Sequence, residues 1–132
     1  MKVKVKTSLI EAEKVIEKSS CTGIKVGEVI NFKDKNIKNK IFLKDNNIKI
    51  IRSSPQYKIT LDFSNNKCEY LLIDENQVLN LQIITKEIII EEGLLKINYK
   101  VDTKDIDTMF ILEYEVVEWN WKIKSKMMFM MF

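Results

Sequence analysis

Histidine is absent from this chain, and proline, cysteine and glycine occur only one, two and three times. Without histidine, the chain has no Ser-His-Asp triad, no histidine metal ligand and no histidine general acid or base. The scarcity of glycine and proline leaves no stretch with the composition of a flexible linker. Carboxylate and lysine chemistry are the classes that these absences leave open.

The two cysteines, Cys21 and Cys68, are far apart in the sequence and do not have the spacing of a metal site. We expect a reduced pair in an intracellular protein, although the sequence also permits a disulfide. The N-terminus alternates lysine with Val3 and Val5, which is a strand pattern rather than the apolar core of a signal peptide. No apolar run approaches the roughly 20 residues of a membrane-spanning helix. These features predict a cytoplasmic location and no membrane span.

Charge is nearly balanced, with 22 basic and 19 acidic residues and a net charge of +3. The lysines are spread along the whole chain, so we predict no nucleic-acid partner; weak binding, suggested by a pI of about 8.7, is the alternative. Most carboxylates alternate outward on predicted strands, which disfavours an acid–base pair. We therefore predict no catalytic residues, no metal, no cofactor and no enzyme activity, with a carboxylate-based hydrolase as a remote alternative.

Alternating apolar and polar residues are the main structural signal. Tyr57–Phe63 has every second residue apolar, as expected of a half-buried strand. Similar short runs recur at spacings of roughly 8 to 12 residues, a rhythm typical of antiparallel barrels and sandwiches. One flat sheet would leave the apolar faces in water, so closure is expected. The sequence predicts an all-β fold: one antiparallel up-and-down β-barrel of about 8–10 strands.

The segment Ser8–Lys18 permits two structures. Ser8 and Glu11 have the spacing of a helix capping box, and Leu9, Ala12 and Val15 fit one helix face. The other structure is a hairpin that turns through Glu11–Glu13, with Lys14–Cys21 as its second strand. We favour the hairpin because the rest of the chain is strongly β.

The clearest hairpin is Val78–Tyr99, two β-type runs joined by a turn that contains glycine. Its first strand has apolar residues at odd positions up to Ile83 and then at even positions from Ile84 to Ile90. A single period of two cannot bury both sets, so we predict a bulge near Ile83–Thr85. The bulge would turn Lys86 inward, whereas a regular strand would turn Glu87 inward.

Three charged residues share parity with apolar neighbours and are therefore predicted to point into the barrel. Arg52 follows Ile48 and Ile50, Lys86 lies among isoleucines, and Glu28 lies within the apolar run Ile24–Phe32. Arg52 is the only arginine, and its planar guanidinium suits a carboxylate. The candidate ligand-binding set is Arg52, Lys86, Glu28, Tyr57 and Thr85, with the last two as hydrogen-bond donors. The alternative is an internal ion pair, or side chains that extend to water at strand ends.

Several stretches together resemble the YwiB-like family of small bacterial proteins. They are IKIIRSSPQYKITLDF, LQIITKEI, EEGLLKINYKV and ILEYEV, and the resemblance extends from Val3 to Val117. It implies a calycin-like, lipocalin-like β-barrel with strands at Thr7–Ser20 and no established activity. The lipocalin Gly-x-Trp motif is missing, Cys21–Asn36 is shorter than its family counterpart, and Trp119–Phe132 has no counterpart.

We therefore expect a barrel domain at residues 1–118 and an apolar C-terminal extension at 119–132 that is not a separate domain. The expected function is binding of a small apolar or amphiphilic anionic ligand in the barrel. The alternative is a protein–protein interaction module or homo-oligomer without a ligand in the lumen, motivated by the apolar extension. The extension either packs on the barrel or on a second copy, stays disordered, or contacts a membrane surface.

Overall fold

The structure is a computed structural model that describes residues 1–117, and within them the chain forms ten antiparallel strands and no helix. Each strand pairs with its neighbours in sequence, and the last strand pairs with the first to close the barrel. This confirms the predicted up-and-down barrel, while the predicted extension at 119–132 lies outside the described residues. The strands are β1 (Lys2–Glu11), β2 (Lys14–Val26), β3 (Val29–Asp34), β4 (Ile37–Lys44), β5 (Asn47–Ser53), β6 (Tyr57–Asp62), β7 (Lys67–Leu72), β8 (Gln77–Glu91), β9 (Leu94–Val101) and β10 (Thr108–Val116).

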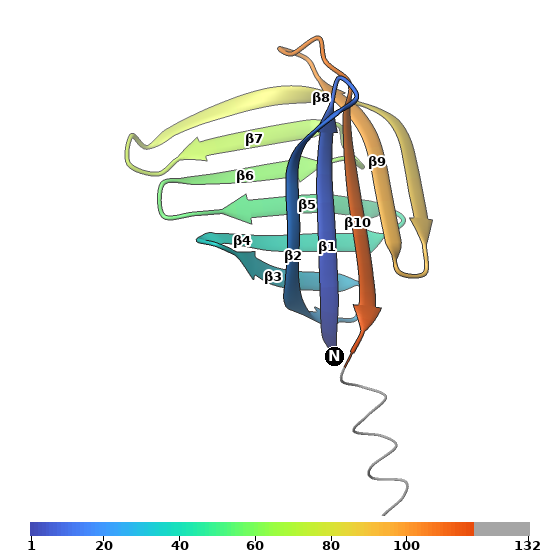
Figure 1. Ribbon diagram of the computed structural model, residues 1–132. Coiled ribbons are helices and arrows are strands. Elements are labelled where there is room, and N and C mark those ends of the chain that lie inside the picture. The colour runs from blue at the N-terminus through green and yellow to red at the C-terminus, as the bar shows by residue number, and fades with distance from the viewer. Residues whose placement is uncertain (118–132) are drawn as a thin grey trace, which may run out of the picture.

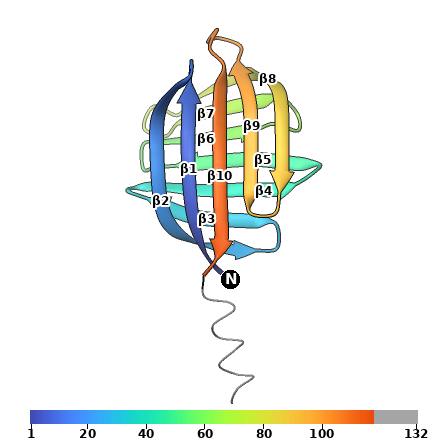
Figure 2. The ribbon, with the colours of Figure 1, turned by 45° about the vertical axis from the view of Figure 1, so that its right-hand side comes forward.

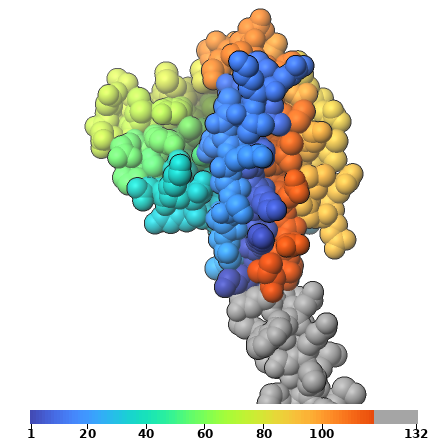
Figure 3. All heavy atoms as spheres, in the orientation of Figure 1, coloured from blue at the N-terminus to red at the C-terminus, as the bar shows by residue number. Residues whose placement is uncertain are grey.

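The barrel is built as two layers whose strands cross. In Figures 1 and 2, β1, β9 and β10 run upright, and β3 to β7 run across them on the other side. The hairpins of the crossing layer protrude to one side of the β1–β2 ribbon in the space-filling view (Figure 3). Two long strands connect the layers: β2 pairs with β3 only through Gly23–Val26, and β8 changes partner from β7 to β9 after Gln82. Such corner strands close an orthogonal barrel.

The ambiguous segment Ser8–Lys18 is a hairpin, as favoured, and not a helix. Strands β1 and β2 are joined by Ala12 and Glu13, whose φ angles are both positive at 49° and 67°. Positive φ at both central residues is the signature of a type I′ turn, which matches the twist of the flanking strands. Neither alanine nor glutamate favours that conformation, so the turn carries backbone strain.

Replacing Ala12-Glu13 by Asn-Gly is therefore expected to stabilise the protein by about 1 kcal/mol, because asparagine and glycine adopt positive φ at lower cost. The measurement is the free energy of unfolding in urea. Exchanging the same two residues for Ser-Ala is the control, since neither replacement relieves the strain. No gain from Asn-Gly over the control would contradict the strain argument.

The predicted bulge in β8 is present, but it lies at Lys86, just beyond the predicted Ile83–Thr85. Lys86 is the extra residue of a bulge, because Thr85 pairs with Tyr99 and Glu87 pairs with the next residue, Asn98. Ile83 is 1% exposed before the bulge, and Ile88 and Ile90 pack against the core after it. The bulge thus lets Ile83 before it and Ile88 and Ile90 after it face the core, whereas Leu79 and Ile84 are 54% and 50% exposed.

The core fills the space between the two layers. Its most deeply buried side chains come from every strand other than β2, β6 and β7. The largest side chains below 2% exposure are Ile30, Ile41, Ile48, Ile83, Leu95, Ile97, Leu112, Val3 and Val5. Tyr99 meets Phe63 edge-on with ring centroids 5.0 Å apart. Cys68 is buried in this core, as predicted, and Cys21 and Cys68 are both free thiols.

One part of the predicted inner face is wrong. Ile24 and Val26 are 57% and 68% exposed, whereas Ile30 and Phe32 are buried. The cause is a turn at Gly27-Glu28, which separates β2 from β3 and gives the two strands independent alternation. The even-numbered apolar residues of Ile24–Phe32 therefore need not point to the same face, because a turn separates the two strands.

Candidate functional site

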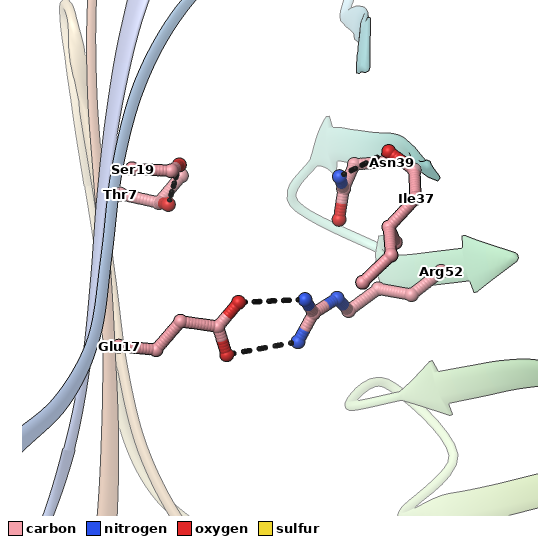
Figure 4. A network of polar contacts seen from close by, with 6 residues as sticks. All are labelled: Thr7, Glu17, Ser19, Ile37, Asn39 and Arg52. Carbon is pink, nitrogen blue, oxygen red and sulfur yellow. Dashed lines mark hydrogen bonds and ion pairs between the residues drawn. The ribbon is translucent and has the colours of Figure 1, made fainter. Parts of the chain in front are cut away.

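An ion pair between Arg52 on β5 and Glu17 on β2 lies inside the barrel. The Arg52 Nη2 and Nη1 atoms lie 2.8 and 3.4 Å from the two carboxylate oxygens of Glu17. Figure 4 shows the two side chains reaching toward each other from opposite walls. Their exposed fractions are 25% for Arg52 and 42% for Glu17. A two-point contact of this kind fixes the guanidinium plane as well as its position.

Glu17 faces the interior because of a bulge in the first hairpin. Leu9 pairs with Glu17, but Ile10 pairs with Val15, so Ile16 is an extra residue. The extra residue reverses the alternation of β2, and it places Glu17 and Ser19 on the inner side. The Ser19 hydroxyl hydrogen-bonds to that of Thr7 on β1, next to the ion pair (Figure 4). The inner wall of β2 is therefore polar at this end of the barrel.

A cavity of about 50 Å³ adjoins the ion pair. This volume holds a few water molecules but is far below the roughly 300–1,000 Å³ of ligand pockets. Apolar side chains of Leu9, Phe32, Ile50, Leu61 and Phe110 make up part of its wall. The rest is polar and is formed by Thr7, Ser8, Glu17, Ser19, Asp34, Asn39, Arg52 and Tyr99. The cavity is thus amphiphilic, with one cation in its wall.

The charges around the cavity are not balanced. Glu17 and Asp34 contribute two carboxylates, and Arg52 contributes the only guanidinium. The Arg52 Nε atom is buried and has no hydrogen-bond partner within the described residues. A buried N–H donor without an acceptor is costly, so a polar atom of a ligand or a water placed beside Nε would be stabilised.

Tyr99 lines the cavity from β9 and is 6% exposed. Burial raises the pKa of its phenol to about 12, with smaller contributions from Cys68 and Glu11, and the Arg52 cation opposes the shift. Burial acts in this direction because it disfavours the charged phenolate.

Stability is therefore expected to fall as pH rises from about 10 to about 12. In this window the unfolded chain ionises Tyr99 while the folded chain keeps the proton, so the loss reaches roughly 2 kcal/mol. Well below pH 10 the phenol is protonated in both states and contributes no slope. Urea unfolding of wild type and Tyr99→Phe at pH 9 and pH 11.5 measures this loss of stability. An equal loss of stability in both proteins would contradict the assignment.

Arg52 and Lys86 were both predicted to point into the barrel. The prediction is confirmed for Arg52 and is wrong for Lys86. Lys86 is exposed, and its Nζ hydrogen-bonds to Asp107 in the loop before β10. This hydrogen bond lowers the pKa of the Asp107 carboxyl. Because Lys86 is itself the bulge residue, it leaves the alternation that would have turned it inward, and its ammonium remains hydrated.

The other predicted residues also lie away from the cavity. Glu28 is exposed in the β2–β3 turn, so its predicted inward orientation is wrong. Tyr57 stacks on Tyr70 with centroids 5.8 Å apart, and the Thr85 hydroxyl donates to Asn66 Oδ1 at 2.7 Å. Neither Tyr57 nor Thr85 lines the cavity. The structure thus keeps one of the five candidates, Arg52, at the site.

The sequence-based candidates missed several residues of the site, among them Glu17, Asp34 and Asn39. Asn39 is 7% exposed on β4, pairs with Arg52 across the ladder, and donates to the Ile37 carbonyl at 3.3 Å. Asn39 lies between Ile37 and Ile41 in the alternation of β4, so the sequence already indicated that it points inward. The sequence offered less indication that Glu17 points inward. Glu17, Ser19 and Cys21 alternate with Lys18 and Ser20, so neither face of β2 is clearly apolar in this stretch.

Within residues 1–117, no group of three acidic or cysteine side chains is arranged to hold a metal ion. The same residues include no helix long and apolar enough to cross a membrane. These findings concern the described part of the chain alone.

Comparison with known proteins supports the fold. No family model matches the chain, and no curated protein sequence matches it. Among solved structures, the chain is similar to the crystal structure of YwiB protein from Bacillus subtilis, with a TM-score of 0.60 and 16% sequence identity. The match covers 88% of this chain and 90% of that one. The resemblance seen in the sequence is confirmed as a likeness of fold, and the finer calycin-like assignment stays a prediction.

Proposed function

Starting from a YwiB-type barrel with an ion pair inside it, we propose that the protein binds a small amphiphilic carboxylate at Arg52. The observation that supports this is the placement of the single arginine in an amphiphilic cavity, held by a half-exposed carboxylate. A guanidinium binds a ligand carboxylate with the same two-point geometry that it now uses for Glu17.

The ligand exchanges with Glu17 rather than joining the pair. A further anion beside Glu17 and Asp34 would meet two negative charges and one positive charge, which is unfavourable. Glu17 is 42% exposed, so its side chain can rotate to water and leave Arg52 to the ligand. Such a rotation enlarges the cavity beyond its present 50 Å³ or so and opens the apolar wall formed by Leu9, Ile50 and Phe110 to a short alkyl chain.

The proposed activity is binding without catalysis. Glu17 is engaged by Arg52, and the chain has no histidine to act as general base at neutral pH. The two free thiols fit the predicted cytoplasmic location, where thiols stay reduced.

Titration calorimetry with a series of linear carboxylates from acetate to octanoate tests the proposal. We expect saturable binding that strengthens with chain length until the cavity is filled. Glu17→Gln removes the competing carboxylate, and since a partly exposed ion pair is worth about 1 kcal/mol, affinity should rise roughly fivefold. Glu115→Gln is the matched control, because Glu115 is exposed on the outer face of β10.

Two results would contradict the proposal. One is the absence of binding by every carboxylate in both wild type and Glu17→Gln. The other is equal binding in wild type, Glu17→Gln and Glu115→Gln, since this would place the ligand away from the ion pair.

A further inference from the structure

A group of exposed apolar side chains lies on the outside of the barrel where the first and last strands meet. We call Ile24, Val26 and Val117 the outer apolar strip; their exposed fractions are 57%, 68% and 46%. The Val117 amide donates to the Lys2 carbonyl at 3.1 Å, and Lys2 pairs with Ile24. The exposed Lys2 therefore lies between Val117 and the two β2 residues on this face, and Figure 1 shows β10 ending beside the N-terminus.

The outward direction of this strip is fixed by packing on the inside. Gly23 is buried, and a Cβ atom there would lie 2.9 Å from the Phe32 Cβ and 3.3 Å from Val5 Cγ2. The inner face of β2 is thus occupied at Gly23, so alternation turns Ile24 and Val26 to the outside. Exposed apolar side chains that gather on one face of a small domain are candidates for burial by another segment or molecule.

The chain itself supplies a segment of suitable chemistry at this place. Residues 118–132 follow directly from Val117, at one end of the strip, and their sequence contains Trp119, Trp121 and the apolar run Met127–Phe132. Neighbouring strands are about 4.8 Å apart, so Ile24, two strands from β10, is roughly 10 Å away. An extended segment spans about 3.3 Å per residue and covers this distance within a few residues.

We propose that the C-terminal segment of the same chain binds the outer apolar strip, with its tryptophan side chains on Ile24 and Val26. The short tether favours this over a second copy, because a directly linked segment acts at millimolar effective concentration. The contact would bury apolar area on both sides without opening the closed barrel. It lies outside the cavity and is independent of the proposed ligand.

Trp119 and Trp121 are the only tryptophans of the chain, so intrinsic fluorescence of the full-length protein reports directly on this segment. We expect emission blue-shifted from that of free tryptophan, protection from acrylamide quenching, and no dependence on protein concentration. Replacing Ile24 and Val26 together by lysine should shift the emission to that of solvent-exposed tryptophan and increase quenching severalfold.

The matched control replaces Val15 and Ile16 by lysine. These residues lie at the other end of β2, are 55% and 52% exposed, and present the same pair of side chains. Circular dichroism checks that both double variants fold, and serine replacements at Ile24 and Val26 serve if lysine prevents folding. Solvent-exposed emission in wild type would overturn the proposal, as would an equal response of the two double variants. A blue shift that appears only at high protein concentration, or only with anionic lipid vesicles, would assign the segment to a second copy or a membrane surface and also overturn it.

Discussion

Replacing Arg52 by glutamine is expected to weaken carboxylate binding by at least about 30-fold, or 2 kcal/mol. The reason is that Arg52 supplies the only guanidinium in the cavity wall, where Glu17 and Asp34 would otherwise repel an anion. The measurement is calorimetric titration with the tightest carboxylate of the series. Stability should change by less than about 1 kcal/mol, because both members of the ion pair are partly exposed.

Variants at the same site separate the geometry of the guanidinium from its charge. Arg52→Lys keeps the charge but loses the two-point contact, so binding should weaken by roughly tenfold. Lys86→Gln removes an exposed cation that pairs with Asp107 and should leave binding unchanged. In a double-mutant cycle, Glu17→Gln should strengthen binding more when Arg52 is present than in the Arg52→Gln background, where it only removes repulsion of the anion. An equal effect of Glu17→Gln in both backgrounds would show that Glu17 does not act by competing for Arg52.

Gly23→Ala is expected to destabilise the protein by about 2–3 kcal/mol, the upper part of the roughly 1–3 kcal/mol typical of overpacked cores. The added Cβ would lie 2.7 Å from the Asn31 carbonyl oxygen and 2.9 Å from the Phe32 Cβ. Both atoms belong to the backbone or the root of a side chain on β3, so neither can move without shifting the strand. Gly23 begins the short contact of β2 with β3 that connects the two layers, so the shift would also strain the corner.

The free energy of unfolding in urea measures this effect. Gly27→Ala is the informative control, because a Cβ there meets nothing within 4 Å but the φ angle is +59°. It should cost about 1 kcal/mol from backbone conformation alone. A loss for Gly23→Ala no larger than that for Gly27→Ala would show that the corner can relax around the extra atom.

The sequence by itself determined the strands, the hairpins and the closure of the barrel. These depend on local alternation and on the need to bury one apolar face, both of which can be read without knowing the partners. It also determined that Arg52 faces inward, because Ile48, Ile50 and Arg52 lie on one unbroken strand. The need for a bulge in β8 was evident as well, since no regular strand buries both Ile83 and Ile88.

The tertiary structure alone decided which residue occupies each bulge and which residues meet across the barrel. Placing the extra residue at Lys86 leaves its ammonium in water, and placing another at Ile16 turns Glu17 inward. The two choices depend on packing against β9 and β1, so local alternation does not reveal them. The partner of Arg52 lies 35 residues away on a strand without an apolar stripe. That pairing arises because closure brings β2 opposite β5, a long-range consequence of the fold that no local pattern encodes.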